Sequence, residues 1–209
     1  MPSFDILIAF AAATFVFAVY PGPALLYTAA QTLARGRKSG LLAALGIHCG
    51  CYLHVIAATL GLSAVFQHVP ALYVALKLIG AAYLVWIGIG MIRKRAKVGE
   101  IAMPAWKSPA RAFLESMLVE ILNPKVAIFF LAFLPQFVDP SAAYPVWLQF
   151  LILGITVNCA FSSADIVTVF LASTVVARLR RAGAMQRLVR IVGGSLIAAL
   201  GVRLALDRS

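Results

Sequence analysis

Charged residues are scarce in this sequence, and acidic residues are the scarcest. Of 209 residues, 12% are charged, and only 7 are Asp or Glu against 18 Lys or Arg. Hydrophobic residues make up 63% of the chain and the mean hydropathy is +0.97, whereas soluble domains are roughly half apolar. This composition excludes an ordinary soluble domain and predicts an integral membrane protein.

Catalytic and redox motifs are also missing. The sequence has no G-x-S-x-G, no H-E-x-x-H and no glycine-rich phosphate loop, so no motif indicates a hydrolytic enzyme. Its three cysteines are Cys49, Cys51 and Cys159, and no C-x-x-C occurs. A membrane thiol oxidoreductase that works through paired cysteines is therefore a remote alternative. We expect neither an enzyme nor a bound cofactor.

Long apolar runs dominate the sequence instead. An α-helix needs about 20 apolar residues to cross a bilayer. The runs predict an all-α fold of six transmembrane helices, at residues 6–34, 41–66, 71–92, 113–138, 147–176 and 191–206. No basic residue precedes the first run, and the run is longer than the core of a signal peptide, so we expect it to be a retained helix.

The basic residues fall in alternate loops. The loops after the first, third and fifth runs are rich in Lys and Arg, whereas those after the second and fourth have none. By the positive-inside rule the three basic loops are cytoplasmic, which puts both termini on the outer side of the membrane. The net charge of +11 therefore reflects topology, and we expect no nucleic-acid partner.

One polar, proline-containing stretch, 93–111, divides the chain. We expect residues 1–99 and 100–209 to form two three-helix repeats of one membrane domain. An odd number of helices in each repeat means that the second is inverted relative to the first.

The third and sixth runs support this relation. Segments 77–92 and 190–205 align without a gap, so that Gly80 falls on Gly193 and Gly88 on Gly201. Such glycine-rich faces are compatible with packing within one chain or in a homo-oligomer.

Proline interrupts the first and fourth runs near mid-membrane, in "YPGP" (20–23) and "NPK" (123–125). Proline lacks a backbone donor and breaks a helix, and the freed polar groups cannot face lipid. Two interrupted helices in inverted halves indicate a substrate site, where helix N-termini suit a carboxylate and exposed carbonyls an ammonium. A simple packing kink is the alternative at each break. The candidate substrate-binding residues are Pro21, Gly22, Pro23, Asn123, Pro124 and Lys125.

Ionisable residues inside the membrane need a reason, because each costs about 2.5 to 3.5 kcal/mol on insertion scales. Glu120 precedes the second break and Asp165 lies in the fifth run. We expect one carboxylate to pair with Lys125 and the other to carry a coupling proton. His54 is a further candidate proton relay. A buried ion pair with no role in transport is the alternative.

The stretch "HCGCYLH" (48–54) offers a competing interpretation. His48, Cys51 and His54 are spaced three apart and so share one stripe of a helix. Imidazole and thiolate groups are ligands that soft metals accept, which leaves a metal exporter as an alternative. The spacing matches none of the usual zinc signatures, so no metal site is expected. Gly46 and Gly50 favour close helix packing on this stripe.

Several motifs together resemble the LysE/RhtB family of amino-acid exporters. They are "YPGPALLYTAAQTLARGRKSGLLAALGIHCG", "LKLIGAAYLVWIGIGMI" and "NPKVAIFFLAFLPQFV", in this order along nearly the whole chain. The resemblance implies a bacterial inner-membrane exporter of an amino acid or derivative, driven by a proton or cation gradient, with its functional breaks at the PGP and NPK elements. The family pattern often has an acidic residue where this chain has Cys51, so a coupling role at that position does not carry over.

Overall fold

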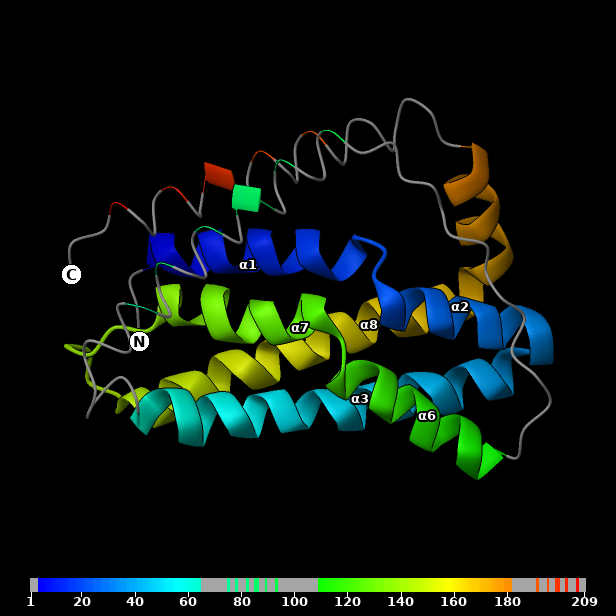
Figure 1. The fold of residues 1–209 in the computed structure, drawn as a ribbon, viewed down its shortest axis with the longest axis horizontal. Helices are drawn as coiled ribbons and strands as arrows, with labels where there is room; N and C mark the ends of the chain where they lie inside the picture. Colours follow the sequence, from blue (N-terminus) through cyan, green and yellow to red (C-terminus); the bar gives the residue numbers. More distant parts are fainter. Residues whose placement is uncertain are drawn as a thin grey trace.

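The computed structural model describes residues 4–64 and 109–181, together with isolated positions between 75 and 93 and between 191 and 206. Within this part of the chain all regular structure is helical, which confirms the all-α part of the predicted fold (Figure 1). The predicted third and sixth helices, with their aligned glycines, lie largely outside these residues.

The described elements follow the apolar runs. In chain order they are α1 (Phe4–Val19), α2 (Pro23–Arg35), α3 (Arg37–Ile56), the π-helix η1 (Ala57–Leu62), α6 (Pro109–Ile121), α7 (Pro124–Ile128), the π-helix η2 (Phe129–Phe133), the 3₁₀-helix η3 (Leu134–Phe137) and α8 (Val146–Arg181). The second predicted run is α3 with η1, and the fifth is α8.

Two described helices are long and apolar enough to cross a membrane by themselves: Arg37–Leu62, of 26 residues, and Val146–Ala172, of 27 residues. Two further pairs meet the same criteria when each pair is taken together. The pair α1 and α2 is bent by 44°, and the pair formed by α6 with Pro124–Phe137 is bent by 41°. Both bends fall at the prolines that interrupt the first and fourth runs.

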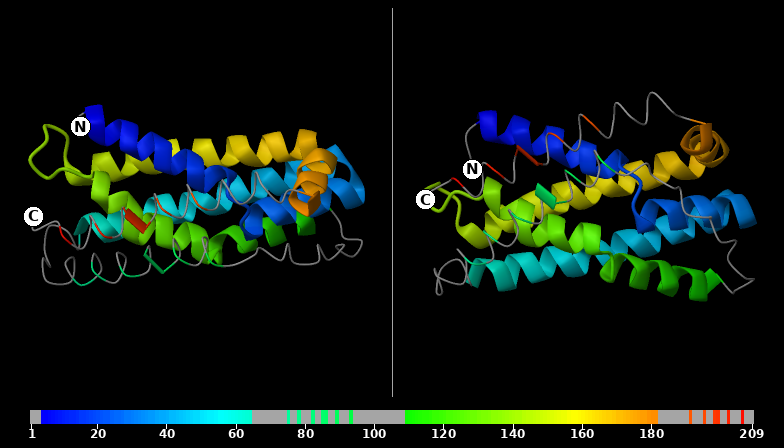
Figure 2. Two further views of the ribbon diagram at one scale, coloured as in Figure 1. Left: turned by 90° about the horizontal axis from the view of Figure 1, so that it is seen from above. Right: turned by 45° about the horizontal axis from the view of Figure 1, so that its top comes forward.

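The long helices lie side by side. In Figures 1 and 2, α1, α3, α7 and α8 follow the long axis of the molecule, while α2 and α6 lie together at one end. Each bent pair therefore contributes one helix to each end of the bundle, and the bends lie towards its middle. This arrangement places both interruptions towards the middle of the bundle, where Gly22 and Asn123 are buried.

Phenylalanine side chains pack α1 against the segment after the second break. The rings of Phe17 and Phe129 have centroids 4.9 Å apart, and those of Phe10 and Phe137 lie 5.2 Å apart, both edge to face. This geometry is the preferred one for aromatic pairs. All four side chains are buried, so the half of the bundle formed by α1 and the segment after the second break is tightly packed and apolar.

Glycines bring α3 against α6. A Cβ atom on Gly50 would lie 2.6 Å from the Met117 carbonyl oxygen, and one on Gly46 would collide with the Phe113 carbonyl and the Ser116 hydroxyl. A backbone carbonyl cannot move aside as a flexible side chain can. The close packing predicted from Gly46 and Gly50 is therefore confirmed.

The helix α8 continues beyond the predicted end of the fifth run at residue 176. It runs to Arg181, with non-helical dihedral angles at Leu171. After this kink its last turns point away from the bundle axis, as the orange segment of Figure 1 shows. The prediction ended the helix too early because it followed hydrophobicity, whereas residues 172–181 contain no glycine or proline to stop a helix.

We expect Gly46→Ala to destabilise the protein, because the new methyl group overpacks the α3–α6 contact at a cost of about 1 to 3 kcal/mol. The matched control is Gly61→Ala, since a Cβ atom there meets nothing within 4 Å. Thermal unfolding of the purified protein in detergent measures both variants. Equal midpoints for the two would contradict the packing argument.

Candidate functional site

The first helix interruption exposes a carbonyl group and a helix N-terminus. Here α1 ends at Val19, and α2 begins at Pro23 with Gly22 as its N-cap. Gly22 is extended, at φ −110° and ψ −179°, and no side chain caps the first amides of α2. The Tyr20 carbonyl follows the last residue of α1, where a helix runs out of internal donors.

The second interruption is capped by its own asparagine. Asn123 is the N-cap of α7, and its Oδ1 accepts a hydrogen bond from the backbone N–H of Lys125, at 3.1 Å. Its Nδ2 donates to Oε2 of Glu120 at 3.0 Å. Asn123 therefore closes this break and holds the Glu120 carboxylate beside it.

Lys125 joins the two interruptions. Its Nζ donates a hydrogen bond to the Tyr20 carbonyl at 2.8 Å, across a sequence separation of 105 residues. Its side chain also packs against Gly22, where a Cβ atom would lie 2.8 Å from Lys125 Cδ. A side chain from the second break thus satisfies a backbone group left by the first, as the absence of water in a membrane interior requires.

The predicted pairing of Lys125 with a carboxylate does not take the form of a direct ion pair, although the group interacts electrostatically with Glu120 and Asp165. Among the described residues Lys125 forms no ion pair, and its ammonium group binds a carbonyl instead. The group lies 5.5 Å from the centre of the Phe161 ring and 5.9 Å from that of Tyr20, within the range of cation–π attraction. The sequence analysis missed this contact because it considered only side-chain partners, whereas the first break supplies a backbone acceptor.

Glu120 and Asp165 are both buried, with 1% and 4% of their surface exposed. Glu120 accepts the hydrogen bond from Asn123 and interacts with the Cys51 thiol. Asp165, on α8, has no hydrogen-bond partner within the described part of the chain, although it interacts electrostatically with Glu120 and Lys125. The structure therefore gathers two acidic groups and one basic group around the two breaks.

His54 reaches this cluster through the backbone. Its Nε2 lies 3.1 Å from the Glu120 carbonyl oxygen, and because a carbonyl only accepts, Nε2 is the donor. The ring also stacks on Phe130, with centroids 5.8 Å apart. His54 thus contacts the peptide of Glu120, while Asn123 binds its carboxylate.

The stripe of possible metal ligands is divided among different partners. His48 Nδ1 lies 2.6 Å from Ser162 Oγ, whereas His54 and Cys51 contact different groups of Glu120. No group of three or more potential ligands gathers among the described residues. This geometry does not favour the metal-exporter alternative.

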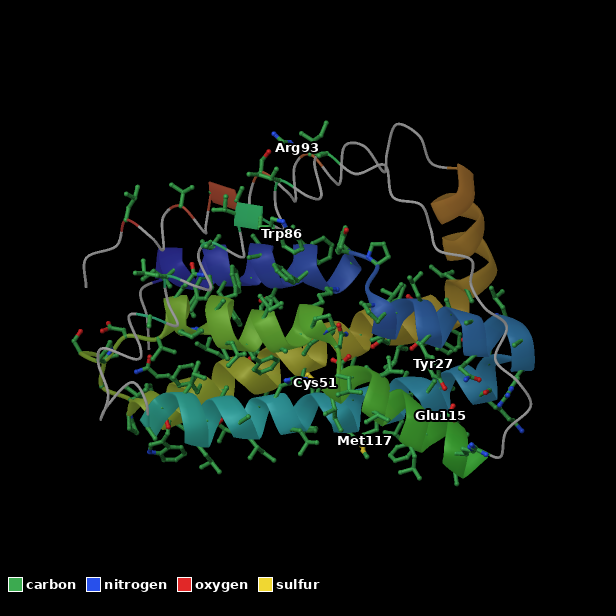
Figure 3. The ribbon with its side chains drawn as sticks, viewed as in Figure 1. Tyr27, Cys51, Trp86, Arg93, Glu115 and Met117 are labelled. Atoms are coloured by element: carbon green, nitrogen blue, oxygen red, sulfur yellow. The ribbon has the colours of Figure 1, made fainter. Side chains whose placement is uncertain are left out.

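A second polar cluster was missed by the sequence analysis. The hydroxyl of Tyr27 on α2 donates to Glu115 on α6 at 3.4 Å, and the buried Gln31 donates to Tyr27 at 2.9 Å. Glu115 also pairs with the exposed Arg111, at 3.5 Å. Figure 3 shows Tyr27 and Glu115 at the end of the bundle where α2 and α6 lie. No sequence signal joins residues 88 positions apart, so only the fold reveals this contact.

Two interrupted helices whose freed backbone groups and buried charges meet inside a helical bundle are a pattern typical of membrane transporters. The profile of one family, LysE type translocator, matches residues 15–208. The chain belongs to this family, and the resemblance drawn from its motifs is confirmed.

Three relatives illustrate the family's range. An uncharacterized membrane protein of Pseudomonas aeruginosa is 31% identical over 190 residues, or 88% of each chain. A leucine efflux protein of an Enterobacter species is 31% identical over 145 residues, which cover 69% of this chain and 68% of that protein. The threonine efflux protein of Escherichia coli is 28% identical over 199 residues, covering 90% and 91%. No solved structure matches the chain.

We expect Asn123→Ala to lower the free energy of unfolding by about 1 to 3 kcal/mol, because the α7 cap and the donor to buried Glu120 are both lost. Asn123→Asp is the matched comparison, since it keeps the cap acceptor but sets a second carboxylate beside Glu120. It is expected to recover part of the stability at acidic pH, where that repulsion is relieved. Unfolding midpoints in detergent at two pH values measure both effects, and a wild-type midpoint for Asn123→Ala would contradict them.

Proposed function

We propose that this protein is a secondary transporter that exports an amino acid, or a close derivative, from the cytoplasm. The observation that carries the proposal is the meeting of the two helix interruptions at Lys125, beside buried Glu120 and Asp165. Membership of the LysE type translocator family supports it, as do the names of its leucine and threonine efflux relatives.

In the proposed architecture each bent helix pair is one broken membrane span. With the runs 71–92 and 191–206, the broken spans, Arg37–Leu62 and α8 make two inverted three-helix repeats. Both termini then lie on the outer side of the bacterial inner membrane. This topology is supported by the alternation of basic loops.

The substrate is proposed to bind between the breaks through its charged groups. Its carboxylate suits the N-terminus of α2, because no side chain caps those amides and the Lys125 ammonium lies beside Gly22. Its ammonium group suits the side of the site where Glu120 and Asp165 lie and where the first break exposes the Tyr20 carbonyl. Pro21, Pro23 and Pro124 act by keeping these segments out of helical hydrogen bonding.

Asp165 is the proposed carrier of a coupling proton. Glu120 already has Asn123 and Cys51 as partners, whereas Asp165 has no hydrogen-bond partner among the described residues. An unpartnered carboxylate in a membrane interior is stabilised by taking up a proton or a cation. His54, on α3, contacts the Glu120 carbonyl and is proposed as one element of the proton path.

Alternating access completes the proposed cycle. Substrate enters from the cytoplasm, one repeat rocks against the other, and the site opens outward. The polar contacts between α2 and α6 and the phenylalanine contacts at the opposite end would open in alternation. Proton entry at the acidic groups then allows the carrier to return to the state that is open to the cytoplasm.

The first test is efflux from proteoliposomes preloaded with a panel of amino acids, with and without a pH gradient. The proposal expects release of one or a few amino acids above the rate of protein-free vesicles, and faster release when the outside is acidic. Equal release rates with and without the pH gradient would contradict proton coupling. No release of any amino acid would overturn the exporter proposal.

We expect Asp165→Asn to abolish acceleration by the pH gradient, because an amide cannot carry the proton, while Glu120→Gln reduces transport at every pH. The reduction for Asp165→Asn is expected to be about tenfold or more at the optimal gradient. Asp139→Asn, in the exposed loop before α8, is the matched control and should behave as the wild type. Full gradient-driven activity of Asp165→Asn would exclude Asp165 from coupling.

A further inference from the structure

The Lys125 ammonium group occupies a site built for an ammonium ion. The Tyr20 carbonyl accepts its hydrogen bond at 2.8 Å, and the rings of Phe161 and Tyr20 lie 5.5 and 5.9 Å from its nitrogen. A carbonyl dipole combined with aromatic faces is the environment in which proteins recognise alkylammonium groups. Nothing in the sequence pattern singles out Phe161 for this role.

The acidic residue nearest in sequence to this aromatic site does not neutralise the lysine by contact. Asp165 lies four residues after Phe161, on the same face of α8, and interacts electrostatically with Lys125. Even so, no ion pair joins them among the described residues. A lysine retained only to neutralise a buried carboxylate would contact it directly, because desolvated charges need close partners. This lysine binds a backbone carbonyl.

We propose that Lys125 holds the ammonium subsite of the substrate when no substrate is bound. The subsite consists of the Tyr20 carbonyl and the rings of Tyr20 and Phe161, and its ligand is the primary ammonium group of the transported amino acid. On loading, this group takes the place of the lysine ammonium. The inference rests on the proposed function and adds to it the means by which the empty carrier is stabilised.

The displaced lysine then has a new partner. The substrate carboxylate is bound at the N-terminus of α2, beside Gly22. Because the Lys125 side chain packs against Gly22, its ammonium group reaches this carboxylate. The lysine ammonium moves from carbonyl to carboxylate, and the subsite exchanges one ammonium group for another. The charge at the Tyr20 carbonyl is therefore the same in the loaded and the empty carrier.

This exchange has a consequence for the transport cycle. If the subsite stays empty while the carrier returns, the Tyr20 carbonyl is buried without a hydrogen bond, which is energetically unfavourable. If Lys125 refills the subsite, this cost does not arise. Net efflux requires the empty carrier to return. Exchange, with substrate on both sides of the membrane, does not require it.

The experiment compares these two modes in Lys125→Met, which keeps the length of the side chain and removes its charge. Because Lys125 also binds the substrate carboxylate in the loaded carrier, both modes are expected to weaken, and exchange is therefore measured at saturating substrate. We expect net efflux into substrate-free medium to fall about tenfold further than exchange, since only net efflux requires the empty carrier to return with its subsite filled. A loss of carboxylate affinity alone would lower both modes together.

A second variant shifts the lysine without removing it. Gly22→Ala places a methyl group against Lys125 Cδ, and the extended backbone at Gly22 accepts alanine without strain. We again expect net efflux to fall more than exchange, but by a smaller factor, with net efflux reduced about threefold. Gly61→Ala, where a Cβ atom meets nothing within 4 Å, is the matched control and should leave both modes unchanged.

The outcomes separate this inference from the proposed function. If the wild type shows neither efflux nor exchange of any amino acid, the exporter proposal fails and the inference with it. If the wild type transports while both variants lose the two modes equally, only the inference is overturned. Thermal unfolding identifies a misfolded Lys125→Met, in which case Gly22→Ala decides: a split supports the inference and parallel loss overturns it.

Discussion

The hydrogen bond from Lys125 to the Tyr20 carbonyl is the interaction on which the rest of the described structure depends. A membrane interior offers no water to a backbone group that a helix has released, so each interruption needs a partner from the protein. Here the partner of the first break comes from the second. This requirement brings α1, α2, α6 and α7 to a common point and gathers the buried charges around it.

The two ends of the bundle are built differently around this point. Phenylalanine rings pack one half, with edge-to-face contacts between α1 and the segment after the second break. Half-buried polar contacts between Tyr27 and Glu115 connect α2 and α6 at the other. Polar contacts that water can replace are cheaper to open than dry aromatic packing. A carrier that alternates between two openings needs contacts at both ends that can separate.

Glycine and proline define this architecture more than any charged residue does. Gly46 and Gly50 let α3 lie directly on the backbone of α6, which sets Cys51 and His54 against Glu120. Asn123 caps the helix that follows one break. Gly22 leaves the other helix N-terminus uncapped and admits the lysine side chain. The chemistry of the site therefore follows from backbone geometry.

Local sequence determined the helical class, the apolar runs and the position of both helix interruptions, because hydrophobicity and proline act over a few residues. It also identified the buried residues Glu120, Asp165 and Asn123. Only the tertiary structure decided their partners, since contacts such as Lys125 with Tyr20 or Tyr27 with Glu115 join positions about a hundred residues apart. The lysine was expected to meet a carboxylate, but it binds a carbonyl. A freed backbone group carries no side-chain signature in the sequence, so its partner follows only from how the helices pack.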